Sequence, residues 1–248
     1  MKRMIKHSLL FILPVASIFI MSCSNDNPLS PKDSKFSAEE PFSFEIPVAS
    51  HSALQLEGIN GTITITQDSE SNSFKIEGVR RVQSESTADA EAHLSELEVS
   101  VQDSTDKVVV KTSQPEQTEG RDYIVDYTIT LPQVMDVNVH SVNGTITLND
   151  IYGSVAVELV NGDIDSNVTL PLDGTIDMGV ANGNIKLDIP KNTSAQFASS
   201  VVNGKINVSN LNLQNKVETS KSVSGISGEG RGTINLSTVN GDISVKGF

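Results

Sequence analysis

The dipeptide Asn-Gly occurs six times in this chain of 248 residues, and each time an isoleucine stands two residues after the glycine. Counting from Asn143, the next copies follow after 18, 21 and 21 residues. A tight turn repeated at a nearly fixed period is typical of repeat architectures. The sequence therefore predicts structural turns at Asn60 and Gly61, Asn143 and Gly144, Asn161 and Gly162, Asn182 and Gly183, Asn203 and Gly204, and Asn240 and Gly241.

The residues on both sides of the turns alternate between apolar and polar. Positions two and four after the glycine are apolar in most copies, as in Ile146 and Leu148, although Ser166 is an exception. Positions five and seven before the glycine are apolar in most copies too, as in Val139 and Val137. Because successive side chains of a strand point to opposite faces, this alternation predicts strands with one buried face.

Two architectures fit this pattern. Asn-Gly between alternating strands is a strong hairpin signal, which would give an antiparallel meander. A β-solenoid also needs one tight corner in each coil, and its asparagines would then stack at a spacing of about 4.8 Å. The same residue types recur at every phase of the repeat, and a solenoid stacks them directly. We therefore predict an all-β, single-domain β-solenoid with rungs of about 20 residues, with the meander as the alternative.

Two stretches break the period. Residues 74–131 separate the first two turns and contain the only convincing helix pattern, residues 88–97, with Thr87 as the expected N-cap. We interpret this stretch as an irregular N-terminal cap that covers the first rungs. Its expected strands are residues 74–82, 97–101, 108–111 and 123–131.

The second break separates Asn203 from Asn240 by 37 residues, which is about twice the period. This spacing predicts a shortened rung in which Ser224-Gly225 replaces Asn-Gly. The isoleucines after the turns are expected to pack against those of adjacent rungs. Ile185 would then lie between Ile164 and Ile206.

The N-terminus carries a targeting signal. Three basic residues precede an apolar stretch, residues 8–20, that is too short to span a bilayer and leads to Cys23, the only cysteine. The residues Ile20, Met21, Ser22 and Cys23 resemble the lipobox of bacterial lipoproteins. In that family the cysteine becomes the new N-terminus and carries acyl chains. The resemblance implies that Cys23 is the lipid attachment site.

These signals divide the chain into three segments. Residues 1–22 are expected to be a lipoprotein signal peptide. Residues 23–41 are rich in Ser, Asn, Pro, Asp and Lys, which favours a flexible tether. Residues 42–248 are expected to form the β-solenoid.

The chain without its signal peptide would be strongly acidic. When Lys2, Arg3 and Lys6 are removed, 15 of the 18 basic residues remain against 31 acidic ones, a net charge of −16. Binding to nucleic acid requires a basic footprint, so this charge excludes nucleic acid as a partner. It also disfavours adsorption to anionic headgroups, which leaves the N-terminal lipid as the contact with the membrane.

Tandem Val-Asn-Gly-x-Ile repeats of this kind resemble an adhesin-like family of β-solenoid domains in bacterial envelope proteins, a family largely of unknown function. The resemblance covers residues 42–248 and rests on the five turns from Asn143 to Gly241. It implies a stiff, repetitive fold and a binding role. It carries no set of catalytic residues.

The residues themselves offer little chemistry. His51, His93 and His140 have no metal-ligand spacing and are expected on the surface, and no nucleophile elbow, phosphate loop or zinc signature is present. Some aspartates could line one outer face, but calcium needs six to eight oxygen ligands and the calcium-binding solenoid motif Gly-Gly-x-Gly-x-Asp is absent. We therefore expect no catalytic residue, no metal and no cofactor. The aspartates in question are Asp163, Asp165, Asp177, Asp188 and Asp242.

The predicted function is that of a lipid-anchored protein of the bacterial envelope, on the outer membrane or cell surface, with a structural or adhesive role and no catalysis. Its partner would be an unknown protein or glycan. One alternative is a polysaccharide-processing β-helix enzyme with paired carboxylates. The chain has no tryptophan and only Tyr123, Tyr127 and Tyr152 as sugar platforms. The other alternative is an envelope-stress component that binds a membrane protein.

Overall fold

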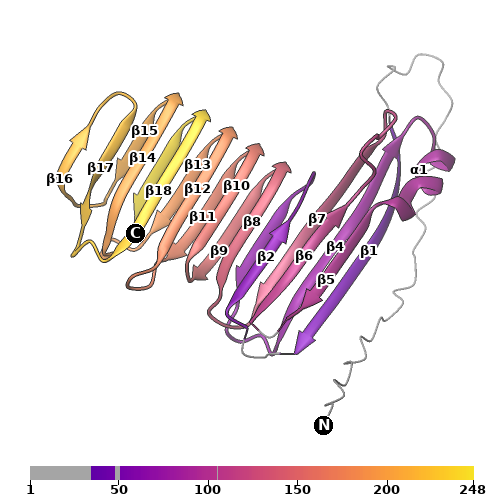
Figure 1. The fold of residues 1–248 in the computed structure, drawn as a ribbon, viewed down its shortest axis with the longest axis horizontal. Coiled ribbons are helices and arrows are strands. Elements are labelled where there is room, and N and C mark those ends of the chain that lie inside the picture. Colours follow the sequence, from indigo (N-terminus) through magenta and orange to yellow (C-terminus); the bar gives the residue numbers. More distant parts are fainter. Residues whose placement is uncertain (1–34, 48–50, 105) are drawn as a thin grey trace, which may run out of the picture. The chain divides into compact units, whose positions relative to one another are not determined.

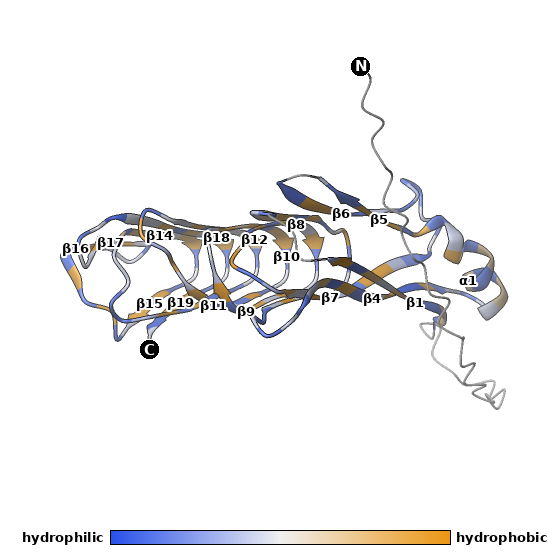
Figure 2. Cartoon of the chain, turned by 90° about the horizontal axis from the view of Figure 1, so that it is seen from below, coloured by the Kyte–Doolittle hydropathy of each residue, from blue (hydrophilic) through white to orange (hydrophobic). Residues whose placement is uncertain are grey.

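The computed structural model describes residues 35–47, 51–104 and 106–248. Within these residues, two β-sheets face each other as two layers around one apolar core (Figures 1 and 2). The spatial order of the nine-stranded sheet is β1 (Phe36–Pro47), β4 (Ser73–Ser84), β7 (Asp122–Leu131), β3 (Ile63–Gln67), β9 (Ile146–Tyr152), β11 (Ile164–Thr169), β13 (Ile185–Ile189), β19 (Ile243–Gly247) and β15 (Ile206–Ser209).

The ten-stranded sheet forms the other layer (Figure 2). Its spatial order is β16 (Leu213–Glu218), β17 (Ser222–Ser227), β14 (Ala195–Asn203), β18 (Gly232–Asn240), β12 (Thr175–Asn182), β10 (Val155–Asn161), β8 (Asp136–Asn143), β2 (Ala53–Glu57), β6 (Lys107–Ser113) and β5 (Glu98–Asp103).

Each repeat forms one rung with a strand in each sheet. At each Asn-Gly corner the chain passes from the ten-stranded sheet to the nine-stranded sheet. For example, β8 lies in the first sheet and β9, after the corner, lies in the second. Equivalent strands of neighbouring rungs pair in parallel, so that Asn161 lies between Asn143 and Asn182. The β-solenoid is therefore confirmed and the antiparallel meander is wrong, because the two arms of a turn lie in opposite sheets and do not pair.

The core consists of the apolar residues that the alternation predicts. Val137, Val139, Ile146 and Leu148 are all at most 1% exposed. Ser166, the exception in the pattern, is buried as well and donates a hydrogen bond to the backbone oxygen of Lys186 (2.9 Å). A buried hydroxyl with such a partner avoids most of the cost of losing water.

The spatial order of the rungs differs from their order in the sequence. The C-terminal rung, β18–β19, lies between β12–β13 and β14–β15. Ile185 therefore pairs with Ile164 and Ile243, and the expected contact with Ile206 is wrong. At the opposite end, β2–β3 lies between β8–β9 and a further rung, β6–β7.

The predicted shortened rung at Ser224-Gly225 is also wrong. The strands β16 and β17 form an antiparallel hairpin, and β17 pairs antiparallel with β14. Gly225 lies opposite Phe197 within this sheet rather than at a corner. The segment between Asn203 and Asn240 thus contains a hairpin that covers the edge of β14.

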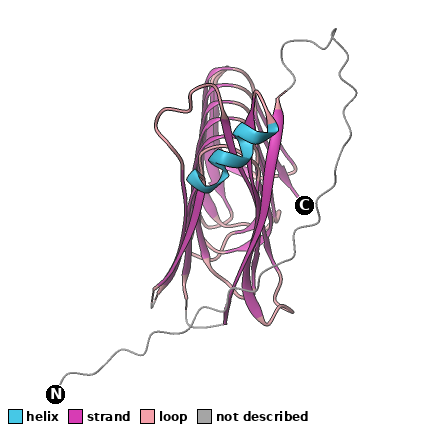
Figure 3. Ribbon diagram, turned by 90° about the vertical axis from the view of Figure 1, so that its right-hand side faces the viewer, coloured by secondary structure: helices cyan, strands magenta, loops and turns pink. Residues whose placement is uncertain are grey.

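The N-terminal cap and its four expected strands are present as β4, β5, β6 and β7, but β6 and β7 form a further rung of the stack, and of the four only β4 and β5 pair antiparallel outside it. Its helix α1 (Thr87–His93) continues as the 3-10 helix η1 (Leu94–Glu96) and lies across the end of the stack that Figure 3 shows in front. The N-cap is Ser86 and not Thr87, since Ser86 Oγ accepts a hydrogen bond from the Asp89 amide (3.1 Å). Buried Ala90 lies on the helix, and Leu97, just after η1, is buried too.

The sheet begins before residue 42, the predicted start of the solenoid. Strand β1 starts at Phe36, which pairs with Ser84 of β4, so residues 36–41 belong to the sheet and not to a tether. The predicted signal peptide, Cys23 and the start of the tether lie outside the described residues. No helix in the described part of the chain is long and apolar enough to cross a membrane.

Candidate binding surface

The six Asn-Gly corners stack into a continuous ladder. The Nδ2 of each asparagine after the first donates to the Oδ1 of the asparagine before it in the spatial series, over distances of 2.6 to 2.9 Å, and Asn60 Nδ2 donates to the backbone oxygen of Tyr123. The spatial order is Asn60, Asn143, Asn161, Asn182, Asn240 and Asn203. The side-chain amides bond to one another and hold neighbouring rungs together, as expected if the turns have a structural role.

The corner glycines are required for two physical reasons. Their φ angles lie between +121° and +151°, a region that favours glycine. The rungs also approach very closely there: a Cβ on Gly183 would lie 1.8 Å from the backbone oxygen of Gly162. At the six corners this distance to the neighbouring backbone oxygen is 1.7 to 2.1 Å. An Asn-Gly pair in a sequence points to the positive φ but not to this close approach.

An aliphatic row runs beside the asparagine ladder on the outer face of the ten-stranded sheet. The residue before each corner asparagine points outward, because the residue before that one, such as Leu159 or Val180, is buried. Val160, Val239 and Val202 are 40, 46 and 61% exposed. We call this set the edge row; in spatial order it is Ile59, Val142, Val160, Ala181, Val239 and Val202.

The edge row is the candidate binding feature that sequence reasoning missed. Its residues appear in the Val-Asn-Gly motif, but they stand on the polar side of the alternation. Other outward positions of the same strands are polar or small, for example Asn138, Asp177 and Ser237. The signal in the sequence was an apolar residue directly before each corner asparagine, at a position where the alternation predicts a solvent-facing side chain.

Carboxylates flank the central part of the edge row. Glu158 and Asp177 are exposed on the strands β10 and β12, and Asp163 and Asp242 are exposed at the corners on the other side. The strands β8, β10, β12 and β18 and the corners that follow them contain no Lys or Arg. The central edge row therefore has carboxylates on both sides, of which Glu158 lies 3.2 Å from His140, and Lys205 lies at the corner of its far end.

A shallow, open depression adjoins the edge row at its far end. It has a volume of about 280 Å³, and its lining includes Ser200, Ser224 and Ser237. Nearby, Gly179 lies within β12 without a positive φ, and a Cβ there would meet only Ser237 Oγ at 3.6 Å. The backbone there would accept a larger residue. Because Gly179 has no side chain, the surface beside Ala181 is recessed relative to the neighbouring rungs.

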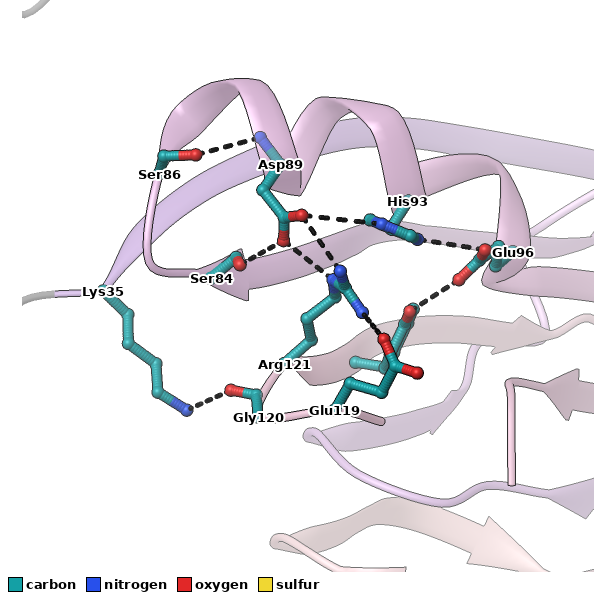
Figure 4. A network of polar contacts seen from close by, with 10 residues as sticks. Lys35, Ser84, Ser86, Asp89, His93, Glu96, Glu119, Gly120 and Arg121 are labelled. Atoms are coloured by element: carbon teal, nitrogen blue, oxygen red, sulfur yellow. Dashed lines mark hydrogen bonds and ion pairs between the residues drawn. The ribbon is translucent and has the colours of Figure 1, made fainter. Parts of the chain in front are cut away.

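The densest cluster of polar side chains lies at α1 (Figure 4). The Asp89 carboxylate accepts two hydrogen bonds from Arg121, 2.7 Å from Nε and 2.9 Å from Nη2, and a third from Ser84. The Tyr123 hydroxyl donates to Glu96 (2.7 Å). These contacts join α1 and η1 to β4 and β7, so the cluster holds the cap on the stack.

The same cluster does not pair Ser84 with a base. His93 lies between two carboxylates, with Nε2 3.5 Å from Asp89 and Nδ1 3.0 Å from Glu96. The Ser84 hydroxyl donates to Asp89 and not to His93, so it lacks the base that would activate it as a nucleophile. Hydrogen bonds from Arg121 and Ser84 hold the pKa of Asp89 well below its usual value, so the carboxylate stays ionised.

We expect the Asp89→Asn variant to be less stable than the native protein at pH 7, with a smaller difference at pH 3. The pKa of Asp89 is lowered in the folded state, so its contribution is present above the unfolded value of 3.8 and is lost as the pH falls below it. Urea titrations at both pH values measure the difference, with the exposed Glu70→Gln as control. An equal loss at both pH values would contradict this role.

The histidines and tyrosines have mostly structural surroundings. His51 is 7% exposed, so its predicted surface position is wrong, and its Nε2 lies 2.7 Å from Asp103 Oδ1. Tyr123 and Tyr127 lie in the core, and burial raises the pKa of Tyr127 to about 12. Only Tyr152, 41% exposed, presents a ring to solvent. The three tyrosines do not form a sugar-binding platform.

The aspartates considered for one outer face are divided between the two sheets. Asp177 lies on the ten-stranded sheet, whereas Asp165 and Asp188 lie on the nine-stranded sheet. Lys186 Nζ contacts Asp165 at 2.9 Å and Asp188 at 3.8 Å. Asp163 accepts a hydrogen bond from the Asn184 amide (2.8 Å) at a corner. No group of three His, Cys, Asp or Glu residues in the described ranges could hold a metal ion.

Comparison with known proteins finds a matching family and a solved structure with a similar fold. A family model described as Toastrack DUF4097 matches residues 46–246. A structure described as a putative cell adhesion protein from Clostridium sporogenes has a TM-score of 0.56 at 13% identity, with 84% of this chain and 100% of that chain covered. A putative adhesin from Bacteroides fragilis has a TM-score of 0.25 at 10% identity, with 84 and 97% covered. No curated protein matches the chain in sequence.

Proposed function

Because the chain belongs to the Toastrack DUF4097 family, we propose that it is a lipid-anchored protein of the bacterial envelope whose solenoid is a rigid binding surface and not an enzyme. The observation that carries this proposal is the edge row, an apolar strip that continues across six rungs while the adjoining corner amides bond to one another. A surface that is rigid before binding loses little entropy when a partner docks.

The chemistry of the rest of the described surface supports binding over catalysis. The α1 cluster is engaged in holding the cap, and the exposed carboxylates of Asp163, Asp165 and Asp242 contact a lysine or a backbone amide. General acid–base catalysis on a sugar would need two carboxylates facing a common substrate site. A glycan and protein array probed with residues 24–248 tests the proposal. Binding to a protein or glycan supports it, and turnover of a polysaccharide would contradict it.

The proposed anchor is Cys23, which follows a lipobox-like sequence and is the only cysteine. We expect the Cys23→Ser variant to leave the membrane fraction and to lose labelling by a fatty-acid probe, because a serine hydroxyl cannot form the thioether to the lipid. Cell fractionation and probe labelling measure both effects, and the Ser24→Ala variant is the matched control. Membrane retention and labelling that persist in Cys23→Ser would refute the anchor.

A further inference from the structure

We propose that the edge row binds a basic amphipathic helix of a partner protein. This inference rests on the proposed binding function and names the surface and the chemistry of the partner. It follows from three observations: the exposure of the row, the acidic residues beside it, and the spacing of its side chains.

The exposure of the row is unusual for a water-facing sheet. Val160, Val239 and Val202 are 40, 46 and 61% exposed and lie on rungs close together in the stack, with Val239 next to Val202. Contiguous apolar surface with a polar border is typical of an interaction site. Each rung contributes one aliphatic side chain, so a partner gains apolar contact at every step along the row.

The charge beside the row selects a basic partner. Glu158, Asp163 and Asp242 lie beside its central rungs, and Asp177 lies four residues before Ala181 on its strand. No Lys or Arg lies on those strands or their corners, although Glu158 lies 3.2 Å from His140 and Lys205 follows the corner of Val202 at the far end of the row. A second copy of this chain would bring the same carboxylates against these, and an anionic lipid surface would be repelled in the same way. Lys or Arg side chains on both sides of an apolar strip would be attracted.

The spacing of the row fits a helix better than a strand. Neighbouring rungs are about 4.8 Å apart, so the six residues span roughly 24 Å. One face of an α-helix presents apolar residues once per turn of about 5.4 Å. The residues on one face of an extended strand are about 6.7 Å apart, which falls out of phase with the row after one or two rungs. The low surface at Ala181 and Gly179 leaves room for one larger side chain of the helix.

The test measures the binding of a designed helical peptide to the mature chain, from residue 23, carrying Cys23→Ser. The peptide has about 18 residues, enough to span roughly 27 Å as a helix, with one leucine per turn on one face and lysines elsewhere. A second peptide has the same composition with the leucines scrambled, and a third has glutamates in place of the lysines. Fluorescence anisotropy at low and physiological salt gives the affinities.

Three substitutions remove the apolar character of the row while preserving its shape. In Val160→Thr, Val239→Thr and Val202→Thr combined, each residue stays β-branched, so the melting temperature is expected to be unchanged. The matched control is Val134→Thr, which alters a valine that is 53% exposed outside the row. We expect the triple variant to bind the first peptide at least tenfold more weakly and the control to bind it normally.

The charges are tested in the same way. We expect Glu158→Gln with Asp177→Asn to weaken binding several-fold, more at low salt than at high salt. The control pair Glu45→Gln and Glu77→Gln removes two exposed carboxylates from the cap and is expected to have no such effect. We also expect Gly179→Val to weaken binding by filling the low surface.

Several outcomes would overturn the inference. The triple variant could bind as well as the native chain, or the scrambled peptide could bind as well as the first, which would mean adsorption by charge alone. Stronger binding by Gly179→Val would mean adsorption to any apolar surface. If these results appear while the array still yields a protein or glycan partner, the edge row is not the docking site and the proposed binding function stands.

Discussion

Truncation of Ile243 to alanine is expected to lower the free energy of unfolding by roughly 2–5 kcal/mol, the range for a large core side chain replaced by alanine. Ile243 is 1% exposed and pairs with Ile185 on one side and Ile206 on the other. It belongs to the last rung in the sequence, yet this rung lies inside the stack. Its loss leaves a cavity between two rungs, and urea denaturation measures the cost.

Ile206→Ala is the matched control for this prediction. Ile206 follows its own Asn-Gly corner at the same position as Ile243, but β15 is the edge strand of its sheet and the side chain is only partly buried. We expect a loss of about 1 kcal/mol, in proportion to the smaller apolar area removed from the core. If Ile206→Ala cost more than Ile243→Ala, the rungs would stack in chain order and the inserted C-terminal rung would be wrong.

Gly183→Ala is expected to destabilise the protein by roughly 2–6 kcal/mol, from about 1–3 kcal/mol of backbone strain and a similar cost of overpacking. Its φ is +148°, and the added Cβ would lie 1.8 Å from the backbone oxygen of Gly162. The two rungs can make room only by breaking their parallel hydrogen bonds. Thermal and urea unfolding of the variant measure this loss.

Gly120→Ala separates the two causes. Gly120 also has a positive φ, +85°, but a Cβ there would meet nothing within 4 Å. In Gly120→Ala we therefore expect only the backbone strain of a left-handed residue, a loss of about 1–2 kcal/mol in the free energy of unfolding. Equal losses at Gly120 and Gly183 would show that close stacking contributes nothing at the corners.

Most of the local structure follows from the sequence because it depends on local physics. The alternation around Ile146 and Leu148 specifies strands with one buried face, and Asn-Gly specifies the corner between them. Identical residue types at one phase of the repeat favour stacking, which the asparagine ladder realises. The helix near Ala90 and the strands of the cap follow from short-range patterns in the same way.

The edge row could not be predicted from local sequence patterns. Val160 and Val239 are visible in the repeated motif, but their importance depends on the exposure of their side chains and on the carboxylates brought beside them. Glu158 and Asp242 are far apart in sequence and flank the same row only because their rungs stack close together. The closeness of the corner backbones at Gly162 and Gly183 is a tertiary property too.

The repeat, the buried face of the repeated strands and the positions of the Asn-Gly corners follow from the amino-acid sequence alone. The spatial order of the rungs follows from tertiary packing. The rungs from Val155, Thr175 and Gly232 carry nearly the same pattern, so each could pair with any other, and local propensity does not distinguish them. The choice depends on long-range packing, with β18–β19 between β12–β13 and β14–β15 and the hairpin β16–β17 covering the remaining edge.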